Sequence, residues 1–492
     1  MPHAAWSRPI RSICPLCPAA AVAVTLLSVF GCTESRPPEF TVKDGIERLY
    51  EPAAVELRSR LLTTFGQPLD SVIWESMPAR LHGAKAEVEL EDADDSLTTF
   101  AVDLDEGYEM APIEPGQQIV WTSGLGAGAV RRIASYDADE GLLEIDEPIV
   151  LEDPDDAEGM VAIQPGHILK QARPLYARHC QHCHGVTGDG AGPTAWSLNP
   201  KPRDFRQGKF KFVSTRTGFR PTRDDLVLTL HRGIDGTSMP SFKAMLTEPE
   251  MAAVTEYVVW LANRGEIEDR AIQVLASDFS KEAYAEAVED EEAEDFEEEW
   301  TEFATEDLSE EFLDWGDAIA SKWNRAESEN AVVLPTVART PMSDESVLSG
   351  RRIYLSAGAK CTECHGRQGL GNGAQTLAYQ RTADGDGYYD IPGLHDSWGN
   401  PIQPRNLHRG LFRGGRRPVD IYRRIHAGIT GANMPAFGGS LSEEQIWDVV
   451  NYVLAVAEDP QINVTLDAKI TEATPPADDA ADDVPDEVAS LP

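Results

Sequence analysis

Positive charge is scarce in this chain. Its 492 residues include 43 lysines and arginines against 83 aspartates and glutamates, which gives a net charge of −40 at pH 7. Because the phosphates of a nucleic acid would repel such a chain, the composition argues against a nucleic-acid partner. The acidity is concentrated in a linker and a tail, so it characterises those segments and not a binding face.

Cysteine is also scarce, and its placement leaves no thiol for a disulfide framework. Three of the seven cysteines fall in the first 32 residues, and the other four form two C-x-x-C pairs that are each followed by histidine. The two C-x-x-C pairs followed by histidine therefore indicate a function other than structural disulfide bonds. The seven are Cys14, Cys17, Cys32, Cys180, Cys183, Cys361 and Cys364.

A long apolar run is missing near the start, where Ala19–Phe30 forms an apolar stretch of only twelve residues. A membrane-spanning helix needs about 20, so this stretch suits the core of a signal peptide better. Two arginines precede it, and residues 1–32 are therefore predicted to be an export signal. The segment ends at Gly31-Cys32, which resembles a bacterial lipoprotein cleavage site. Cys32 is the predicted lipidation site, with simple secretion or a retained N-terminal anchor as alternatives.

The hydrophobic period changes within residues 33–165. Apolar residues at helical spacing come first, interrupted by Pro52, and from about residue 86 apolar and acidic residues alternate as in a half-buried strand. Asp137–Gly141 is a turn signal between two apolar runs and predicts a hairpin. We therefore predict an N-terminal domain over 33–165 that consists of a helix followed by a β-rich part.

Two later regions, 166–265 and 346–460, repeat one another. Leu230–Ala262 aligns without a gap to Ile425–Ala457, and 13 of the 33 aligned positions are identical. Each copy has a capping-box pattern at the start of a helix that carries an apolar stripe. The repeat predicts two modules built on one plan.

Residues 266–345, between the modules, are strongly acidic, with 17 acidic residues and one lysine from Lys281 to Asp314. Disorder is the usual interpretation of such a run. Aromatic residues nevertheless recur here at steps of three and four, which is typical of helices with one buried face. We predict two acidic helices docked on one of the modules, with a solvated face and with their carboxylates attracted to the clustered arginines of that module. The final segment, 461–492, is predicted to be a disordered acidic tail.

Each module contains one C-x-x-C-H motif. Two residues between the cysteines let both sulfurs reach the two vinyl-derived carbons at one haem edge, and the adjacent histidine is carried beneath the ring, where it can ligate iron. A zinc site would need two converging pairs, and a redox C-x-x-C would not need a histidine in both copies. The motifs predict two covalently bound haem c groups on Cys180, Cys183, Cys361 and Cys364, with iron ligated by His184 and His365.

With these motifs, the two modules resemble class I cytochromes c over about 215 of the 492 residues. The resemblance implies that a methionine before the last helix is the other axial ligand, and Met239-Pro240 and Met434-Pro435 stand in that place. A thioether is soft and uncharged, so it favours ferrous iron. His231 and His426, eight residues before the methionines, are the rival ligands.

The resemblance also assigns supporting residues. In the family, a proline-containing segment offers a backbone carbonyl to the second nitrogen of the ligating histidine, which fixes its ring. Pro202-Arg203 and Pro404-Arg405 are the matching pairs in this sequence. Their arginines are predicted to neutralise haem propionates.

The whole sequence predicts a mainly α protein: two all-α cytochrome c-like modules, an acidic helical connector and a β-rich N-terminal domain. The predicted function is one-electron transfer at the periplasmic face of a bacterial cytoplasmic membrane, between redox partner proteins of a respiratory chain and without a substrate of its own. The alternatives are a dihaem peroxidase-like enzyme with a displaceable iron ligand, and a fixed electron-transfer subunit of a respiratory complex.

Overall fold

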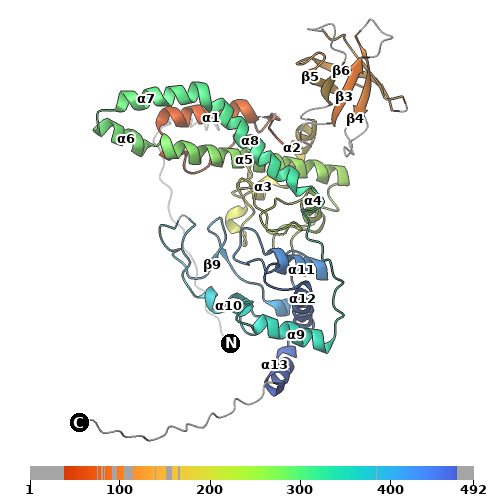
Figure 1. Ribbon diagram of the computed structural model, residues 1–492, viewed down its shortest axis with the longest axis vertical. Coiled ribbons are helices and arrows are strands. Elements are labelled where there is room, and N and C mark those ends of the chain that lie inside the picture. Colours follow the sequence, from red (N-terminus) through yellow and green to blue (C-terminus); the bar gives the residue numbers. More distant parts are fainter. Residues whose placement is uncertain are drawn as a thin grey trace, which may run out of the picture. The chain divides into compact units, whose positions relative to one another are not determined.

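The computed structural model describes residues 38–473, except 75, 79–80, 82–83, 91–96, 105–112, 114, 139, 151–157, 164–166 and 384 (Figure 1). The predicted export signal, with Cys32, lies outside the described residues, and so does the chain beyond residue 473. Among the helices of the described part, none combines the length and the apolar character that crossing a membrane requires.

Module 1 is organised around two packed helices. Its elements are α2 (His167–His179), α3 (Gln181–His184), the short turn η3 (Ala195–Ser197), α4 (Arg223–Arg232) and α5 (Glu248–Asp278). α2 packs on α5 through Tyr176 and Tyr257, whose ring centroids are 5.0 Å apart. A capping box of Thr247 and Glu250 begins α5, as the sequence predicts, because each side chain satisfies a backbone N–H of the other residue.

Module 2 repeats this plan. Its elements are α9 (Asp344–Leu355), α10 (Cys361–His365), η5 (Ala374–Thr376), the strand pair β9 (Leu394–His395) and β10 (Pro401–Ile402), η6 (Leu407–Arg409), α11 (Pro418–Ala427) and α12 (Glu443–Glu458). Tyr354 on α9 meets Tyr452 on α12 at a centroid distance of 5.2 Å. Ser442 and Gln445 form the capping box of α12. The two helix pairs are therefore equivalent, although module 2 carries the additional β9–β10 segment.

Helix α5 runs through residue 265, where the sequence places the end of module 1. Ile267, Ala271 and Leu275 are buried and continue its apolar stripe at steps of four. The helix ends only at Asp278, and the side chain of Ser280 caps the helix that follows. The predicted boundary between module and connector thus lies inside one helix of 31 residues.

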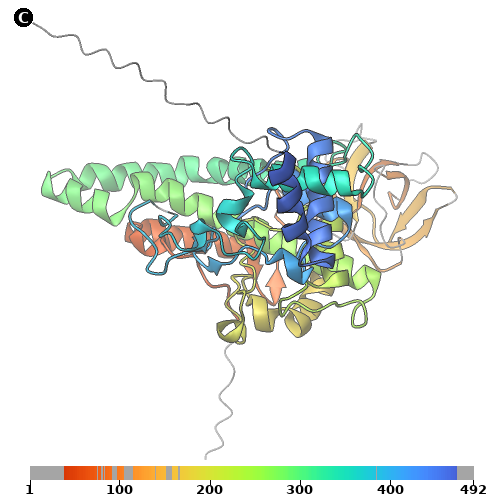
Figure 2. The same cartoon turned by 90° about the horizontal axis from the view of Figure 1, so that it is seen from below.

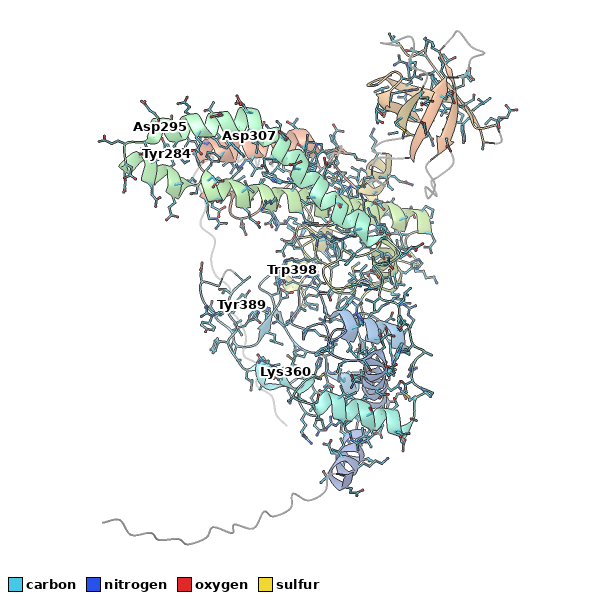
Figure 3. The ribbon with its side chains drawn as sticks, viewed as in Figure 1. Tyr284, Asp295, Asp307, Lys360, Tyr389 and Trp398 are labelled. Carbon is cyan, nitrogen blue, oxygen red and sulfur yellow. The ribbon has the colours of Figure 1, made fainter. Side chains whose placement is uncertain are left out.

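The connector is helical. It consists of α6 (Lys281–Glu289), α7 (Ala293–Glu302), a π-helical turn (Phe303–Asp307) and α8 (Leu308–Ala326). Figures 1 and 2 show these helices beside α1 (Glu51–Phe65) and α5, and Figure 3 labels three of their side chains. Trp300, Phe312 and Trp323 are buried, so the aromatic spacing correctly predicts one inward face.

The prediction that carboxylates dock the connector is wrong. Within the described residues, none of the carboxylates from 282 to 314 forms an ion pair, and the pair at the edge of this segment joins Lys281 to Glu51. Aromatic contacts hold the helices instead. Trp300 meets Phe279 at 5.1 Å, and Phe312 meets Trp74 at 6.1 Å between ring centroids. Burying these rings removes apolar area from water, whereas exposed carboxylates gain little from pairing.

The residues predicted to form one N-terminal domain belong to two separate cores. The turn η1 (Ile46–Arg48), helix α1 and the strand pair β1 (Gly66–Gln67) and β2 (Asp70–Ser71) precede the β-rich part. Leu57 and Phe65 of α1 are fully buried in the same core as α2, α5 and α8. Helix α1 is therefore part of module 1, because its apolar face covers α5.

The β-rich part is a closed antiparallel barrel. Its strands are β3 (Ala84–Leu90), β4 (Thr99–Leu104), β5 (Gln118–Gly124), β6 (Val130–Asp137), β7 (Leu142–Ile145) and β8 (Glu158–Ile163), in the order β3-β4-β7-β6-β5-β8. Asp137 pairs with Leu142, which confirms the predicted hairpin. Phe100 and Trp121 meet in the core of the barrel. The chain therefore contains a closed β-barrel besides its helical modules, so the predicted mainly α class is only partly correct.

The prediction of disorder from residue 461 is wrong for its first part, because Ile462–Ala473 form helix α13. Leu466 is buried against module 2. Arg351 of α9 is fully buried, and Asp467 of α13 accepts hydrogen bonds from it at 2.9 and 3.0 Å. A buried guanidinium needs a hydrogen-bonding anion, and this helix supplies it.

Candidate functional site

The C-x-x-C-H motifs form short helical turns that follow α2 and α9. In module 1 the backbone N–H of His184 donates to the carbonyl of Cys180 at 2.9 Å, which closes the turn around the two sulfurs. Burial raises the pKa of the Cys180 thiol to about 12 and that of Cys361 to about 11, so both are protonated at neutral pH. Cys180, Cys183 and His184 together line one cavity of module 1.

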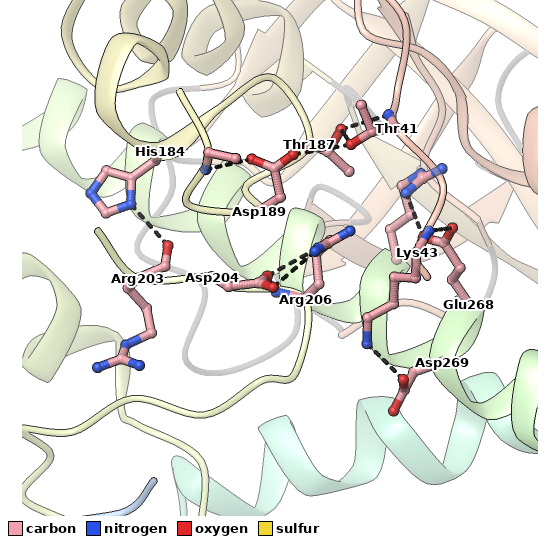
Figure 4. Close-up of polar contacts among 12 residues, drawn as sticks. Thr41, Lys43, His184, Thr187, Asp189, Arg203, Asp204, Arg206, Glu268 and Asp269 are labelled. Carbon is pink, nitrogen blue, oxygen red and sulfur yellow. Dashed lines mark hydrogen bonds and ion pairs between the residues drawn. The ribbon is translucent and has the colours of Figure 1, made fainter. Parts of the chain in front are cut away.

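Each motif histidine is oriented by the carbonyl of an arginine. Nδ1 of His184 lies 3.1 Å from the Arg203 carbonyl oxygen (Figure 4). In module 2, Nδ1 of His365 lies 3.1 Å from the Arg405 carbonyl oxygen. A proton on Nδ1 leaves the lone pair of Nε2 available for a metal. Burial lowers the pKa of His184 to about 4 and also lowers that of His365, so both rings are neutral at pH 7. Phe205 stacks on His184 at 4.6 Å between ring centroids.

Glycine allows the proline-arginine segments to approach the motif loops. A Cβ on Gly190 would stand 2.7 Å from the Pro202 carbonyl oxygen, and one on Gly371 would clash in the same way with Pro404. Both glycines also have positive φ, +73° and +78°, which other residues rarely adopt. The close approach brings Arg203 and Arg405 under the histidines.

The predicted methionine ligands lie in two loops with the same hydrogen bonds. The carbonyl of Met239 accepts from the backbone N–H of Ile234 at 3.1 Å, and that of Met434 accepts from Ile429 at 3.1 Å. Both methionines are half-buried against the core of their module. Met239 lines the same cavity as His184, as a two-ligand iron site requires.

The rival histidines are engaged elsewhere. Nε2 of His231 lies 2.6 Å from a carboxylate oxygen of Glu248, at the start of α5. His426 stacks on Tyr422 and packs so closely on Gly438 that a Cβ there would stand 2.6 Å from its ring. His179, which the sequence suggests is a surface residue, is half-buried and lines the cavity of module 1 beside Phe242.

The cavity of module 1 has a volume of about 680 Å³ and suits a haem. Its walls combine apolar side chains with Arg203, Lys211 and Arg413. The Nε atom of Arg413 is buried without a hydrogen-bond partner among the described residues, and burial lowers the pKa of this side chain to about 10. A propionate carboxylate would supply the missing acceptor and countercharge. Five lining residues belong to module 2: Asp396, Asn400, Pro401, Ile402 and Arg413.

Two tyrosines support the motifs in a way that the sequence analysis misses. The hydroxyl of Tyr176 donates to the Gly185 carbonyl at 2.8 Å, and that of Tyr354 donates to the Gly366 carbonyl at 2.6 Å. The N-terminal segment also holds the loop after the motif of module 1, because the backbone N–H and the hydroxyl of Thr41 both form hydrogen bonds with the hydroxyl of Thr187 (Figure 4). An aromatic residue in the helix before each motif is the available signal, but its distance from the first cysteine differs between the copies.

Comparison with known proteins identifies the two modules. Residues 169–262 match the family model described as cytochrome c, and residues 345–453 match the model described as cytochrome c oxidase, cbb3-type, subunit III. The chain therefore contains two cytochrome c domains, which imply covalently bound haem c and electron transfer. No curated protein matches the chain.

Among solved structures, a chain of the reducing HAO-like protein complex of Kuenenia stuttgartiensis is similar at 24% identity, with a TM-score of 0.39. The match covers 58% of this chain and 96% of the other. A TM-score at this level supports no functional inference.

Proposed function

We propose that this chain is a dihaem c-type cytochrome that carries single electrons between a membrane or periplasmic donor and a terminal acceptor, and that it turns over no substrate of its own. The observation that carries the proposal occurs in both modules. A half-buried, neutral histidine in a C-x-x-C-H turn donates through Nδ1 to an arginine carbonyl at 3.1 Å. Such a histidine is a preorganised iron ligand with its ring orientation already fixed.

The proposed roles follow the geometry residue by residue. The cysteine sulfurs would hold haem as thioethers, the motif histidines and the loop methionines would be the axial ligands, and the half-buried arginines beside them would face the propionates. Haem supplies the one-electron ferrous–ferric couple. The chain would keep the ligands in place in both oxidation states, because backbone hydrogen bonds fix their loops. The four sulfurs belong to Cys180, Cys183, Cys361 and Cys364, and the axial pairs are His184 with Met239 and His365 with Met434.

The test is haem counting followed by a redox titration with optical spectra on the purified holoprotein. Two haems per chain should remain attached after acid-acetone extraction, because thioether bonds are covalent. Both should be six-coordinate and low-spin, with spectra of His–Met ligation. Complete extraction of haem would contradict the c-type assignment, and bis-histidine spectra would contradict the methionine ligands.

The first alternative, a fixed subunit of a respiratory complex, has specific support. The model that matches residues 345–453 describes an oxidase subunit rather than a free carrier. The barrel and the connector could then serve as assembly surfaces. Purification from membranes in mild detergent decides between the two proposals, since a stable stoichiometric partner favours the subunit.

The second alternative is a dihaem peroxidase-like enzyme, which needs one iron with a vacant or labile position. Rapid peroxide consumption after one-electron reduction, at about 10 per second as in ordinary enzymes, with a high-spin signal at one haem, would favour it over the carrier.

The proposed location is the periplasmic face of the bacterial cytoplasmic membrane, with a lipid on Cys32. The support is the sequence alone, namely the short apolar stretch followed by Gly31-Cys32. Replacing Cys32 with serine should release the holoprotein from the membrane fraction while leaving its haem content unchanged. A variant that stays in the membrane fraction would indicate a retained helical anchor.

A further inference from the structure

Module 2 contains an insertion that module 1 lacks. The segment between the glycine loop and the proline-arginine pair runs from 374 to 403 in module 2, but only from 193 to 201 in module 1. The longer segment contains β9 and β10 and ends beside Arg405. Trp398, labelled in Figure 3, lies in the turn between these two strands.

On one side, the insertion holds the loop that carries Met434. The backbone N–H of Ser397 donates to the Gly431 carbonyl at 3.2 Å, and the side-chain amide of Asn433 donates to the His395 carbonyl at 3.2 Å. The Trp398 ring lies so close to Gly431 that a Cβ there would stand 2.5 Å from it. The position of Trp398 is therefore tied to the methionine loop of its own module.

On the other side, the insertion contacts two side chains of module 1. The Arg203 guanidinium lies over the Trp398 ring, 3.6 Å from its centroid. Asp396 accepts a hydrogen bond from Lys211 of module 1 at 2.8 Å, and their side chains are only 5% and 13% exposed. Asp396 also accepts from the backbone N–H of Trp398, which fixes the turn. Arg203 is the residue whose carbonyl orients His184.

A reciprocal contact runs from module 2 to module 1. Arg405, whose carbonyl orients His365, extends its guanidinium to 3.5 Å from the place where a Cβ would stand on Gly236. Gly236 lies three residues before Met239. Each arginine that supports a histidine thus reaches toward the methionine loop of the other module, directly in one case and through Trp398 in the other.

We infer that Trp398 is a positioning residue for both haem sites and, with its insertion, forms the junction that sets how one electron is shared between them. The Arg203 cation lies in the cavity wall of module 1, while the same tryptophan braces the methionine loop of module 2. A change at the ring therefore alters the surroundings of both irons. This inference rests on the two haems of the proposed function.

The step itself moves one electron and nothing else. With two haems bound, the iron of the donating haem would go from ferrous to ferric, and the iron of the accepting haem from ferric to ferrous. No proton or leaving group is exchanged. The quantity that Trp398 controls is the equilibrium constant for this transfer, which follows from the difference between the two midpoint potentials.

The experiment is a potentiometric titration of the full-length holoprotein and four variants, with haem content measured on each. Trp398→Ala should change the equilibrium constant by about tenfold, a typical size for coupling between sites, which is about 59 mV for a one-electron couple. Trp398→Phe should stay close to wild type, because it keeps an aromatic face for Arg203 and Gly431. Tyr379→Ala is the matched control, since Tyr379 is an exposed aromatic residue of the same insertion.

Arg203→Lys keeps the backbone carbonyl and the charge but loses the planar stack, so it tests the junction if Trp398→Ala loses haem. It should shift the constant in the same direction as Trp398→Ala. Unchanged potential differences in Arg203→Lys and in any haem-replete Trp398→Ala would overturn the inference and leave the proposed function intact. A wild-type chain with fewer than two haems would contradict both.

Discussion

The two modules hold their motifs in the same way but are supported by different surroundings. In both, a tyrosine hydroxyl fixes the loop after the motif, and an arginine carbonyl fixes the histidine. Module 1 is wrapped by α1, α5 and α8, whose aromatic residues share one core. Module 2 has a smaller core and relies on α13 and on buried Arg351. The hydrogen-bond geometry around the two motifs is therefore the same, although different elements stabilise the two modules.

This comparison predicts that each motif loads independently. Replacing Cys361 and Cys364 together by alanine should remove one haem and leave the spectrum of module 1 unchanged. The reason is that the residues that hold the first motif, Tyr176 and Arg203, make their hydrogen bonds within module 1. Intact mass and pyridine haemochrome spectra measure the effect. The matched change at Cys180 and Cys183 is the control, and loss of both haems from either variant would show that the modules load together.

The methionine loops should be equivalent despite their different surroundings, because their backbone hydrogen bonds are the same. Met239→Ala and Met434→Ala should each remove about half of the weak charge-transfer band of Met-ligated ferric haem, and the double variant should abolish it. A band that survives in the double variant would place the ligands elsewhere, with His231 and His426 the next candidates.

Stability should separate the modules. Trp323 of α8 is fully buried, and its Nε1 donates to Glu266 at 3.2 Å. Trp323→Ala should cost about 3–5 kcal/mol in the free energy of unfolding of module 1, because it leaves a large cavity. Denaturant unfolding followed at each haem should show an earlier transition for module 1 and an unchanged transition for module 2. Leu334→Ala, at an exposed position between α8 and α9, is the control.

A matching change should destabilise module 2. Asp467→Ala leaves the fully buried Arg351 without its carboxylate, although the Tyr452 hydroxyl and a backbone carbonyl still accept from it. The expected cost is about 3 kcal/mol, confined to module 2. Truncation after Pro460 should have at least the same effect. Wild-type stability in both would mean that α13 does not contribute to the fold.

The smallest expected effect concerns salt. Because aromatic packing holds the connector and its carboxylates form no ion pairs in the described residues, proteolysis between Lys281 and Asp314 should change little between low salt and 1 M salt. Trp300→Ala should accelerate cleavage at both salt concentrations. Strong acceleration by salt alone would restore the electrostatic docking that the sequence suggests.

The sequence predicts what is local or repeated. The two motifs, the capping boxes, the hairpin at Asp137–Gly141 and the helical connector follow from spacing alone. Periodicity shows which face of an element is buried but not against which neighbour, so it does not assign α1 to module 1. The acidic composition predicts disorder from residue 461. It does not reveal that Asp467 meets a buried arginine.

The role of Trp398 could not be predicted from the sequence for a different reason. Trp398 lies in an insertion without a counterpart in module 1, so comparing the repeats gives no signal for it. Its partner, Arg203, is far away in the sequence and belongs to the other module. From the sequence, the Arg203 side chain is assigned only to a propionate, because a contact across two modules has no local pattern.

The barrel begins and ends at one point, since Ala84 at the start of β3 is paired with Ile163 at the end of β8. The core of module 1 draws on residues both before and after it, so the barrel interrupts that module in the chain while keeping a core of its own. A segment whose two ends lie together can be inserted into a domain, or removed from it, without separating the parts of the domain on either side. Descent could therefore have added this barrel to an ancestral cytochrome in one event, and relatives that lack it would retain both haem-binding modules.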